Sequence, residues 1–182
     1  MPSFKCSADI NNVMCRLSLG HVNVQCLRNK INLLEHFLVN ANLLDIMCIT
    51  EHWASSGDLP IYAPQYYSII ASFWRVKMKH GGASIFMRTD MLSRFKSVED
   101  LRYDHSFSVE GSIEISAVKI SACDISFCVV CIYRPPGGDY NLFLNKLSLC
   151  LAHVLKKSDN LILCGDINVD YNSNSVKKLL LC

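Results

Sequence analysis

The sequence lacks any apolar run long enough to cross a membrane. A helix that spans a bilayer needs about 20 consecutive, predominantly apolar residues, and no run among the 182 residues approaches that length. The N-terminal residues, MPSFKCSADINN, also lack the unbroken apolar core and the small-residue cleavage pattern of a secretory signal. We therefore expect an intracellular protein, nuclear or cytoplasmic and not secreted, with no membrane partner.

A strongly basic composition is also missing. The 18 Lys and Arg residues stand against 16 Asp and Glu residues, which leaves a formal net charge of +2 at pH 7. Such a small excess produces no positive field over the whole surface, so any polyanionic partner would be bound through local groups. No tract rich in Pro, Gly or Ser divides the chain, and its length and 51% hydrophobic content predict one domain with a sizeable core.

The sequence also lacks a complete set of cysteines or histidines at the spacing of a zinc site. The sequence has ten cysteines, but Cys128-x-x-Cys131 lies in a strand-like run where positions three apart face opposite sides. No second such pair completes a zinc ligand set. We therefore expect reduced thiols and no zinc. Six cysteines lie in apolar patterns, where free Cys behaves as a small hydrophobic residue: Cys26, Cys48, Cys128, Cys131, Cys150 and Cys164.

Strand and helix patterns alternate irregularly along the chain. An extension over residues 1–16 precedes a domain over 17–182. Asp139 is placed to cap the most clearly amphipathic helix, and the strands at 111–120 and 124–133 predict a hairpin. Without strict βαβ alternation, the pattern favours an α+β layered sandwich. Strands are expected at 17–24, 45–50, 66–70, 83–88, 111–120, 124–133 and 160–165, and helices at 29–41, 139–157 and from 175.

Polar residues follow the ends of four predicted strands. Taken singly, each has an ordinary structural explanation: a turn, a solvated carboxylate, a rim aromatic or a loop cap. Taken together, they can meet on one rim of a sheet, where two carboxylates and neutral donors suit a hard divalent cation and a phosphate. The residues are Asn23, Glu51, Tyr133, Asp166 and Asn168.

Five blocks of the sequence carry a resemblance to a known family. In order and spacing they resemble the apurinic/apyrimidinic-type endonuclease domain of non-LTR retrotransposons, in the endonuclease/exonuclease/phosphatase superfamily. The resemblance runs from about residue 17 to the end and implies a four-layer α/β sandwich, with two facing β-sheets flanked by helices. The blocks are LGHVNVQCLRNKINLLEHFL, LLDIMCITEHW, KHGGASIFMR, CIYRPP and NLILCGDINVD.

The resemblance also implies Mg2+-dependent phosphodiester hydrolysis, with Mn2+ as the alternative ion, and DNA as the partner. By matching position, Glu51 would be the principal metal ligand, and Asn23 would assist on the metal side. Tyr133 would contact the scissile phosphate. Asp166 would orient or deprotonate the attacking water, and Asn168 would help to hold the phosphate and this aspartate.

Nucleic-acid contacts are expected from three basic residues within the matched blocks: Arg28, Lys30 and Arg134. His52, beside Glu51, is the histidine we expect nearest the site, in a rim position without a catalytic task. A lipid or inositol phosphatase is a weaker alternative, because the RPP block after Tyr133 argues against it.

One departure from the family pattern affects the expected activity. Similar domains continue further and end in a Ser-Asp-His block, and full-length relatives carry a reverse transcriptase domain, whereas this sequence stops at Cys182. We therefore expect a domain that lacks its last strands and nicks DNA with impaired activity. The alternative is a catalytically inactive remnant with at most weak DNA or metal binding.

Overall fold

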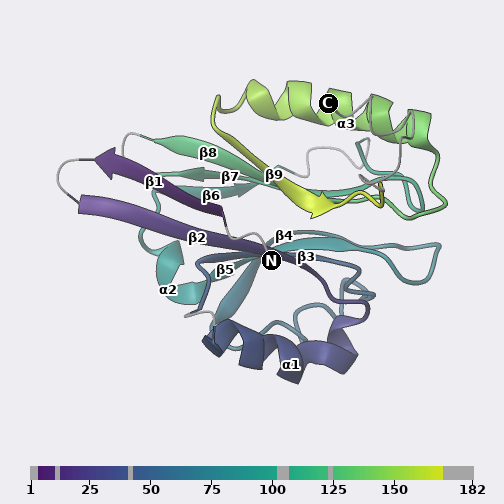
Figure 1. Cartoon of the computed structure of the whole chain (residues 1–182), viewed down its shortest axis with the longest axis horizontal. Coiled ribbons are helices and arrows are strands. Elements are labelled where there is room, and N and C mark those ends of the chain that lie inside the picture. The colour runs from purple at the N-terminus through teal and green to yellow at the C-terminus, as the bar shows by residue number, and fades with distance from the viewer. Residues whose placement is uncertain (1–3, 11–12, 41–42, 102–106, 123–124, 170–182) are drawn as a thin grey trace.

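Two mixed β-sheets face each other in the computed structural model, which describes residues 4–10, 13–40, 43–101, 107–122 and 125–169 (Figure 1). The first sheet has the strand order β1-β2-β3-β5-β4, and the second has the order β6-β7-β8-β9. The first sheet comprises β1 (Phe4–Ile10), β2 (Val13–Asn23), β3 (Ile46–Thr50), β4 (Tyr67–Phe73) and β5 (Ala83–Arg88). The second comprises β6 (Ser97–Asp100), β7 (Glu114–Ser121), β8 (Ser126–Tyr133) and β9 (Leu161–Asp166).

Helices cover the outer faces of both sheets. Figure 1 shows α1 (Leu27–Asn40) on the first sheet and α3 (Tyr140–Leu155) on the second, while the four-residue helix α2 (Thr89–Leu92) follows β5. One apolar cluster lies between the sheets, a second lies between the second sheet and α3, and a third lies between the first sheet and α1. The four-layer sandwich predicted from the sequence is therefore confirmed.

Local sequence explains the most regular helix. Asp139 accepts hydrogen bonds from the backbone N–H groups of Asn141 and Leu142 at 2.9 and 3.0 Å, which satisfies donors that have no partner inside the helix. The apolar stripe of α3 then buries Phe143 and Leu147 against the second sheet. The predicted cap is confirmed, although the helix ends at Leu155 and not at residue 157.

Several boundaries differ from the predicted ones. β2 begins at Val13, four residues before the expected strand, and pairs with β1, which was not predicted. The four-residue strand β6 and the short α2 were also not predicted, because SVED and TDML are too short and too polar to show a period. The helix expected from Ser175 lies outside the described residues. Among the described helices, none is long and apolar enough to cross a membrane.

Two pairs of parallel strands, one pair in each sheet, end at one edge of the sandwich. β2 runs parallel to β3, with Asn23 opposite Thr50. β8 runs parallel to β9, with Tyr133 opposite Asp166, and the predicted β7–β8 hairpin is antiparallel. Because the carboxyl ends of parallel strands lie at the same edge, each pair delivers its last residues together, one pair from each sheet.

Candidate active site

The side chain of Asn23 joins the two sheets at this edge. Its Nδ2 group donates one hydrogen bond of 2.7 Å to Oε1 of Glu51 and another of 2.7 Å to Oδ2 of Asp166. Asn23 ends β2 in the first sheet, Glu51 follows β3, and Asp166 ends β9 in the second sheet. The structure therefore brings together three of the five strand-end residues around a single amide group.

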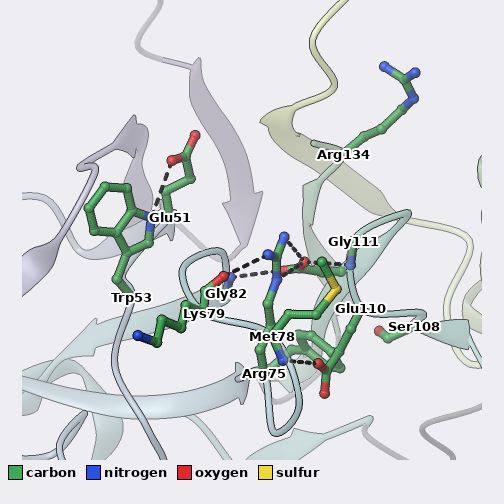
Figure 2. Close-up of polar contacts among 12 residues, drawn as sticks. Glu51, Trp53, Arg75, Met78, Lys79, Gly82, Ser108, Glu110, Gly111 and Arg134 are labelled. Atoms are coloured by element: carbon green, nitrogen blue, oxygen red, sulfur yellow. Dashed lines mark hydrogen bonds and ion pairs between the residues drawn. The ribbon is translucent and has the colours of Figure 1, made fainter. Parts of the chain in front are cut away.

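The backbone at Glu51 turns sharply after β3. Glu51 has a φ of 57°, a left-handed conformation that costs a residue with a side chain about 1–3 kcal/mol. Its N–H donates to the carbonyl of Gly82 at 2.8 Å, and the Trp53 indole donates to Oε2 of Glu51 at 3.3 Å (Figure 2). Both oxygens of this carboxylate are thus oriented by nitrogen donors that sequence spacing did not reveal.

A second irregular segment follows β9. Gly165 has a φ of 141°, and a Cβ at this position would collide with the backbone carbonyl oxygen of Ile132 on β8. Asn168 has a φ of 50°, and its backbone N–H donates to Oδ1 of Asp166 at 3.1 Å. The Asn168 amide also donates to the Arg134 carbonyl at 2.7 Å. The two carboxylate oxygens of Asp166 thus have different donors, the Asn168 backbone at Oδ1 and the Asn23 amide at Oδ2.

The phenol of Tyr133 lies beside Glu51. Tyr133 is 5% exposed, and its burial raises the pKa of its hydroxyl above the ordinary value. The negative charge of Glu51 and a hydrogen bond to it raise this pKa further. Tyr133 therefore stays protonated at neutral pH and can act as a hydrogen-bond donor.

A cleft opens beside Asn23, Asp166 and Asn168, whereas Glu51 and Tyr133 are not among its lining residues. Its lining comes from β2 and from the segment that ends β9: His21, Asn23, Gly165, Asp166, Ile167, Asn168 and Val169. Burial lowers the pKa of the His21 imidazole, while the charges of Cys164 and Asp166 oppose this shift. The His21 ring is hydrogen-bonded to the Thr50 hydroxyl at 3.1 Å, so it forms part of the wall below Asn23.

His52 does not occupy the rim position expected from the sequence. It is 1% exposed, its Nε2 bonds to the Phe73 carbonyl at 2.9 Å, and its Nδ1 accepts from the N–H of Ala54 at 3.0 Å. Burial lowers the pKa of His52 to about 4, so the ring is neutral at pH 7. The cleft contains His21 instead, because β2 directs that residue toward the same edge as Asn23.

A buried ion pair supports the turn beside Glu51. Arg75 lies 2.5 Å from Glu114, and their side chains are 8% and 0% exposed. The other oxygen of Glu114 accepts a 2.5 Å hydrogen bond from the N–H of Gly82, and the carbonyl of Gly82 accepts from the N–H of Glu51. Burial raises the pKa of Glu114, while Gly82 and Arg75 oppose the shift. This network was not predicted, because Glu114 lies in an otherwise apolar strand pattern.

The basic residues expected to contact nucleic acid fall in different environments. Arg134 is 1% exposed; its guanidinium donates to the carbonyls of Ile167, Asn168 and Gly138 at 2.9–3.3 Å. Arg134 therefore ties β8 to the segment after β9, and its contact with nucleic acid stays a prediction that these bonds do not support. In the first turn of α1, Arg28 is exposed and Lys30 is half-buried.

An exposed aromatic pair lies at the rim. Trp53 is 38% exposed and stacks on His80, with ring centroids 4.1 Å apart. The backbone N–H of Trp53 donates to the Gly81 carbonyl at 2.9 Å, so this rim residue is held to the same glycine turn as Glu51. Trp53 was overlooked because nothing in CITEHW distinguishes a rim aromatic from a core one.

Comparison with solved structures finds this architecture in nucleases and phosphatases. The endonuclease domain of TRAS1, a telomere-specific non-LTR retrotransposon, is 14% identical with a TM-score of 0.61, over 90% of this chain and 66% of that one. TDP2 from D. rerio, in complex with a single-strand DNA product, is 14% identical with a TM-score of 0.59, over 85% and 61%. The mannosyl-6-phosphatase Bt3783 of Bacteroides thetaiotaomicron is 15% identical with a TM-score of 0.60, over 91% and 70%. The chain has the endonuclease/exonuclease/phosphatase fold.

The endonuclease/exonuclease/phosphatase fold is shared at low sequence identity, so it does not select one substrate. This chain spans roughly 61 to 70% of the length of the three structures. No protein-family model and no curated protein matches the sequence.

Proposed function

We propose that this chain is a divalent-metal-dependent phosphodiesterase that nicks DNA, of the kind associated with non-LTR retrotransposons. The observation that carries the proposal is the pair of carboxylates, Glu51 and Asp166, held 2.7 Å from one amide group of Asn23. Two carboxylates at a rim with neutral hydrogen-bond donors suit a metal ion and the phosphate that it activates.

The donor set fits a hard cation. Glu51 offers carboxylate oxygens, which Mg2+ prefers, and Mn2+ is accepted by similar ligands. Asn23 presents Nδ2 to both carboxylates, while its Oδ1 accepts from the N–H of Gln25 at 3.2 Å. We therefore propose Glu51 as the ligand and Asn23 as the residue that aligns it, and not as a second ligand. When bound, the ion would polarise a phosphoryl oxygen and stabilise charge on the leaving oxygen.

The remaining residues act on the attacking water and on the phosphate. Asp166, with Oδ1 and Oδ2 each fixed by one nitrogen donor, orients the attacking water and accepts its proton. Tyr133 donates its hydroxyl hydrogen to the phosphate, which its raised pKa permits even in alkaline solution. Asn168 offers a further amide donor at the same edge. Preorganised donors of this kind stabilise the negative charge that develops on the phosphate.

DNA as the substrate is supported by the rim beside Glu51. The exposed Trp53–His80 stack offers an aromatic surface on which a base can stack, a contact worth about 1–3 kcal/mol per base. Arg28 lies beside this rim, because the N–H of Leu27, which begins α1, donates to the His52 carbonyl at 3.0 Å. The similarity to the TRAS1 endonuclease domain and to TDP2 bound to single-strand DNA favours the same substrate class. A reverse transcriptase domain is the partner we propose for a full-length relative, where the 3′-hydroxyl of the nick primes synthesis.

Nicking of supercoiled plasmid tests the proposal. With Mg2+ the chain should convert supercoiled plasmid to the open circle, and EDTA should stop the conversion. Asp166→Asn should lower the rate by about 10²–10⁴-fold, because it removes the proton acceptor. Asp159→Asn is the matched control, since Asp159 is exposed in the turn after α3. Equal rates for the two variants, or nicking that survives EDTA, would contradict the proposal.

Two further measurements test the substrate. Trp53→Ala should weaken binding of a single-stranded oligonucleotide, measured by anisotropy in EDTA, while Tyr66→Ala at an exposed aromatic should not. Release of phosphate from mannose 6-phosphate should be undetectable. Turnover of that sugar phosphate with no nicking would replace DNA by a small phosphomonoester as the substrate.

A further inference from the structure

Three cysteines from distant parts of the chain meet between the two sheets. Cys48 lies on β3, Cys131 on β8 and Cys164 on β9, and their sulfur atoms all lie within 4.8 Å of one another. Cys48 and Cys131 are fully buried, and Cys164 is partly exposed. Spacing along the sequence gave no sign of this group, because each thiol comes from a different strand.

The cluster forms the layer directly beneath the candidate active site. Residues two apart on a strand face the same side, and Cys131 precedes Tyr133 by two while Cys164 precedes Asp166 by two. Cys48 likewise precedes Thr50, the neighbour of Glu51. On β2, His21 likewise precedes Asn23 by two residues. Each of the strands β2, β3, β8 and β9 therefore has a histidine or a cysteine two residues before its end, on the same side as its last residue.

The chemistry of the cluster differs from that of an apolar core. The thiol of Cys131 donates to the Ile49 carbonyl and the thiol of Cys164 donates to the Val130 carbonyl, each at 3.7 Å, so a lone pair on each sulfur stays free for a metal ion. Three cysteine sulfur atoms within 4.8 Å of one another are a ligand arrangement that soft cations favour, since zinc and copper(I) select cysteine sulfur. Mg2+ selects oxygen ligands, so such an ion does not compete for Glu51.

We propose that Cys48, Cys131 and Cys164 form a binding site for one thiophilic metal ion, with Zn2+ as its type ion. Binding would exchange the S–H protons of Cys48, Cys131 and Cys164 for the ion and release all three to solvent. With three protein ligands, zinc completes its tetrahedral coordination with one small ligand such as water. The ion would link β3 of the first sheet to β8 and β9 of the second, and so hold Glu51 and Asp166 at their present separation. This proposal departs from the expectation of reduced thiols and no zinc, which rested on the spacing of cysteines along the sequence.

Cobalt(II) provides a spectroscopic test that is independent of nuclease activity. Reduced, metal-free chain titrated with Co2+ should develop thiolate-to-cobalt charge-transfer absorption at one ion per chain, and Zn2+ should remove it. Zn2+ should also raise the Tm. Cys164→Ser should weaken binding by more than the roughly 10–100-fold that loss of an outer-shell partner costs. Cys128→Ser is the matched control, because Cys128 is buried on the opposite face of β8, against α3.

Two additional variants, Cys131→Ala and Glu51→Gln, separate loss of the metal site from misfolding and from loss of nicking. Cys131→Ala repeats the test if Cys164→Ser does not fold by circular dichroism. Glu51→Gln should lose nicking but keep the cobalt spectrum, so failure of the proposed nuclease function leaves this inference standing. An absence of charge-transfer absorption in the wild-type chain would overturn the site. The same conclusion would follow if Cys164→Ser and Cys131→Ala both retained the wild-type spectrum and affinity.

Discussion

The Asn23 amide donates a 2.7 Å hydrogen bond to Asp166, a residue 143 positions later in the chain and on the opposite sheet. Asn23 also binds Glu51 at 2.7 Å, so one side chain sets the spacing of both carboxylates. The site is therefore sensitive to a residue that we do not place on the metal or on the phosphate.

Asn23→Ala should lower the rate of plasmid nicking by about 10–100-fold, the usual cost of losing a group that orients a metal ligand. The Mg2+ concentration needed for half-maximal rate should rise, because Glu51 is no longer aligned. Asn141→Ala is the control, since this asparagine is exposed at the start of α3. A reduced rate with an unchanged Mg2+ dependence would show that Asn23 acts on the substrate and not on the metal ligand.

The free energy of unfolding should depend on His52 below neutral pH. Burial lowers the pKa of His52 from 6.5 to about 4, so between these values the unfolded chain binds a proton that the folded chain does not. Stability is therefore lost as the pH falls from 6.5 toward 4, by about 3 kcal/mol in total. Urea denaturation at several pH values should show a shallower slope for His52→Gln. His36→Gln, at an exposed position on α1, should keep the wild-type slope.

Removing Arg75 should destabilise the fold through Glu114. Arg75→Met leaves a buried carboxylate without its cation, which typically costs about 3–5 kcal/mol. The double variant with Glu114→Gln should be more stable than the single one, because no buried charge remains. Asp90→Asn removes the exposed partner of Arg88 and should change the urea midpoint little. If Arg75→Met behaved like Asp90→Asn, the buried pair would not support the Gly82 turn.

Gly165→Ala should disturb β9 directly before Asp166. The added Cβ would meet the Ile132 carbonyl oxygen, and the φ of 141° is unfavourable for any residue with a side chain. We expect a loss of at least about 1–3 kcal/mol in urea denaturation, together with reduced nicking. Gly137→Ala is the matched control, since a Cβ there would meet nothing within 4 Å. Wild-type stability for both variants would mean that β8 and β9 separate easily at this point.

The sequence predicted those helices and strands whose own residues carry a full apolar repeat, a cap or a turn. The capped helix α3 and the β7–β8 hairpin were recognisable because their apolar residues repeat at helical or strand spacing. β6 was not recognisable, because its four residues include two acids and it depends on pairing with β7. The strand-end residues could be proposed because a polar group after an apolar run is unusual.

Features that depend on how the two sheets meet could not be read from spacing. The burial of Arg134 follows from contacts with the segment after β9, which no local period encodes. The choice between His21 and His52 at the cleft was likewise set by the turn at Glu51. The cysteine cluster is the clearest case, since Cys48 and Cys164 become neighbours only when one sheet packs on the other.

The hydrogen bond between Asn23 and Asp166 also has a consequence for folding. Contacts between residues far apart in sequence form slowly, because a long loop must close before they are made. No intermediate that contains a single sheet holds both carboxylates near Asn23, so partly folded chains have no complete site. In a refolding experiment, the proposed nicking activity should therefore appear only with the final docking of the two sheets.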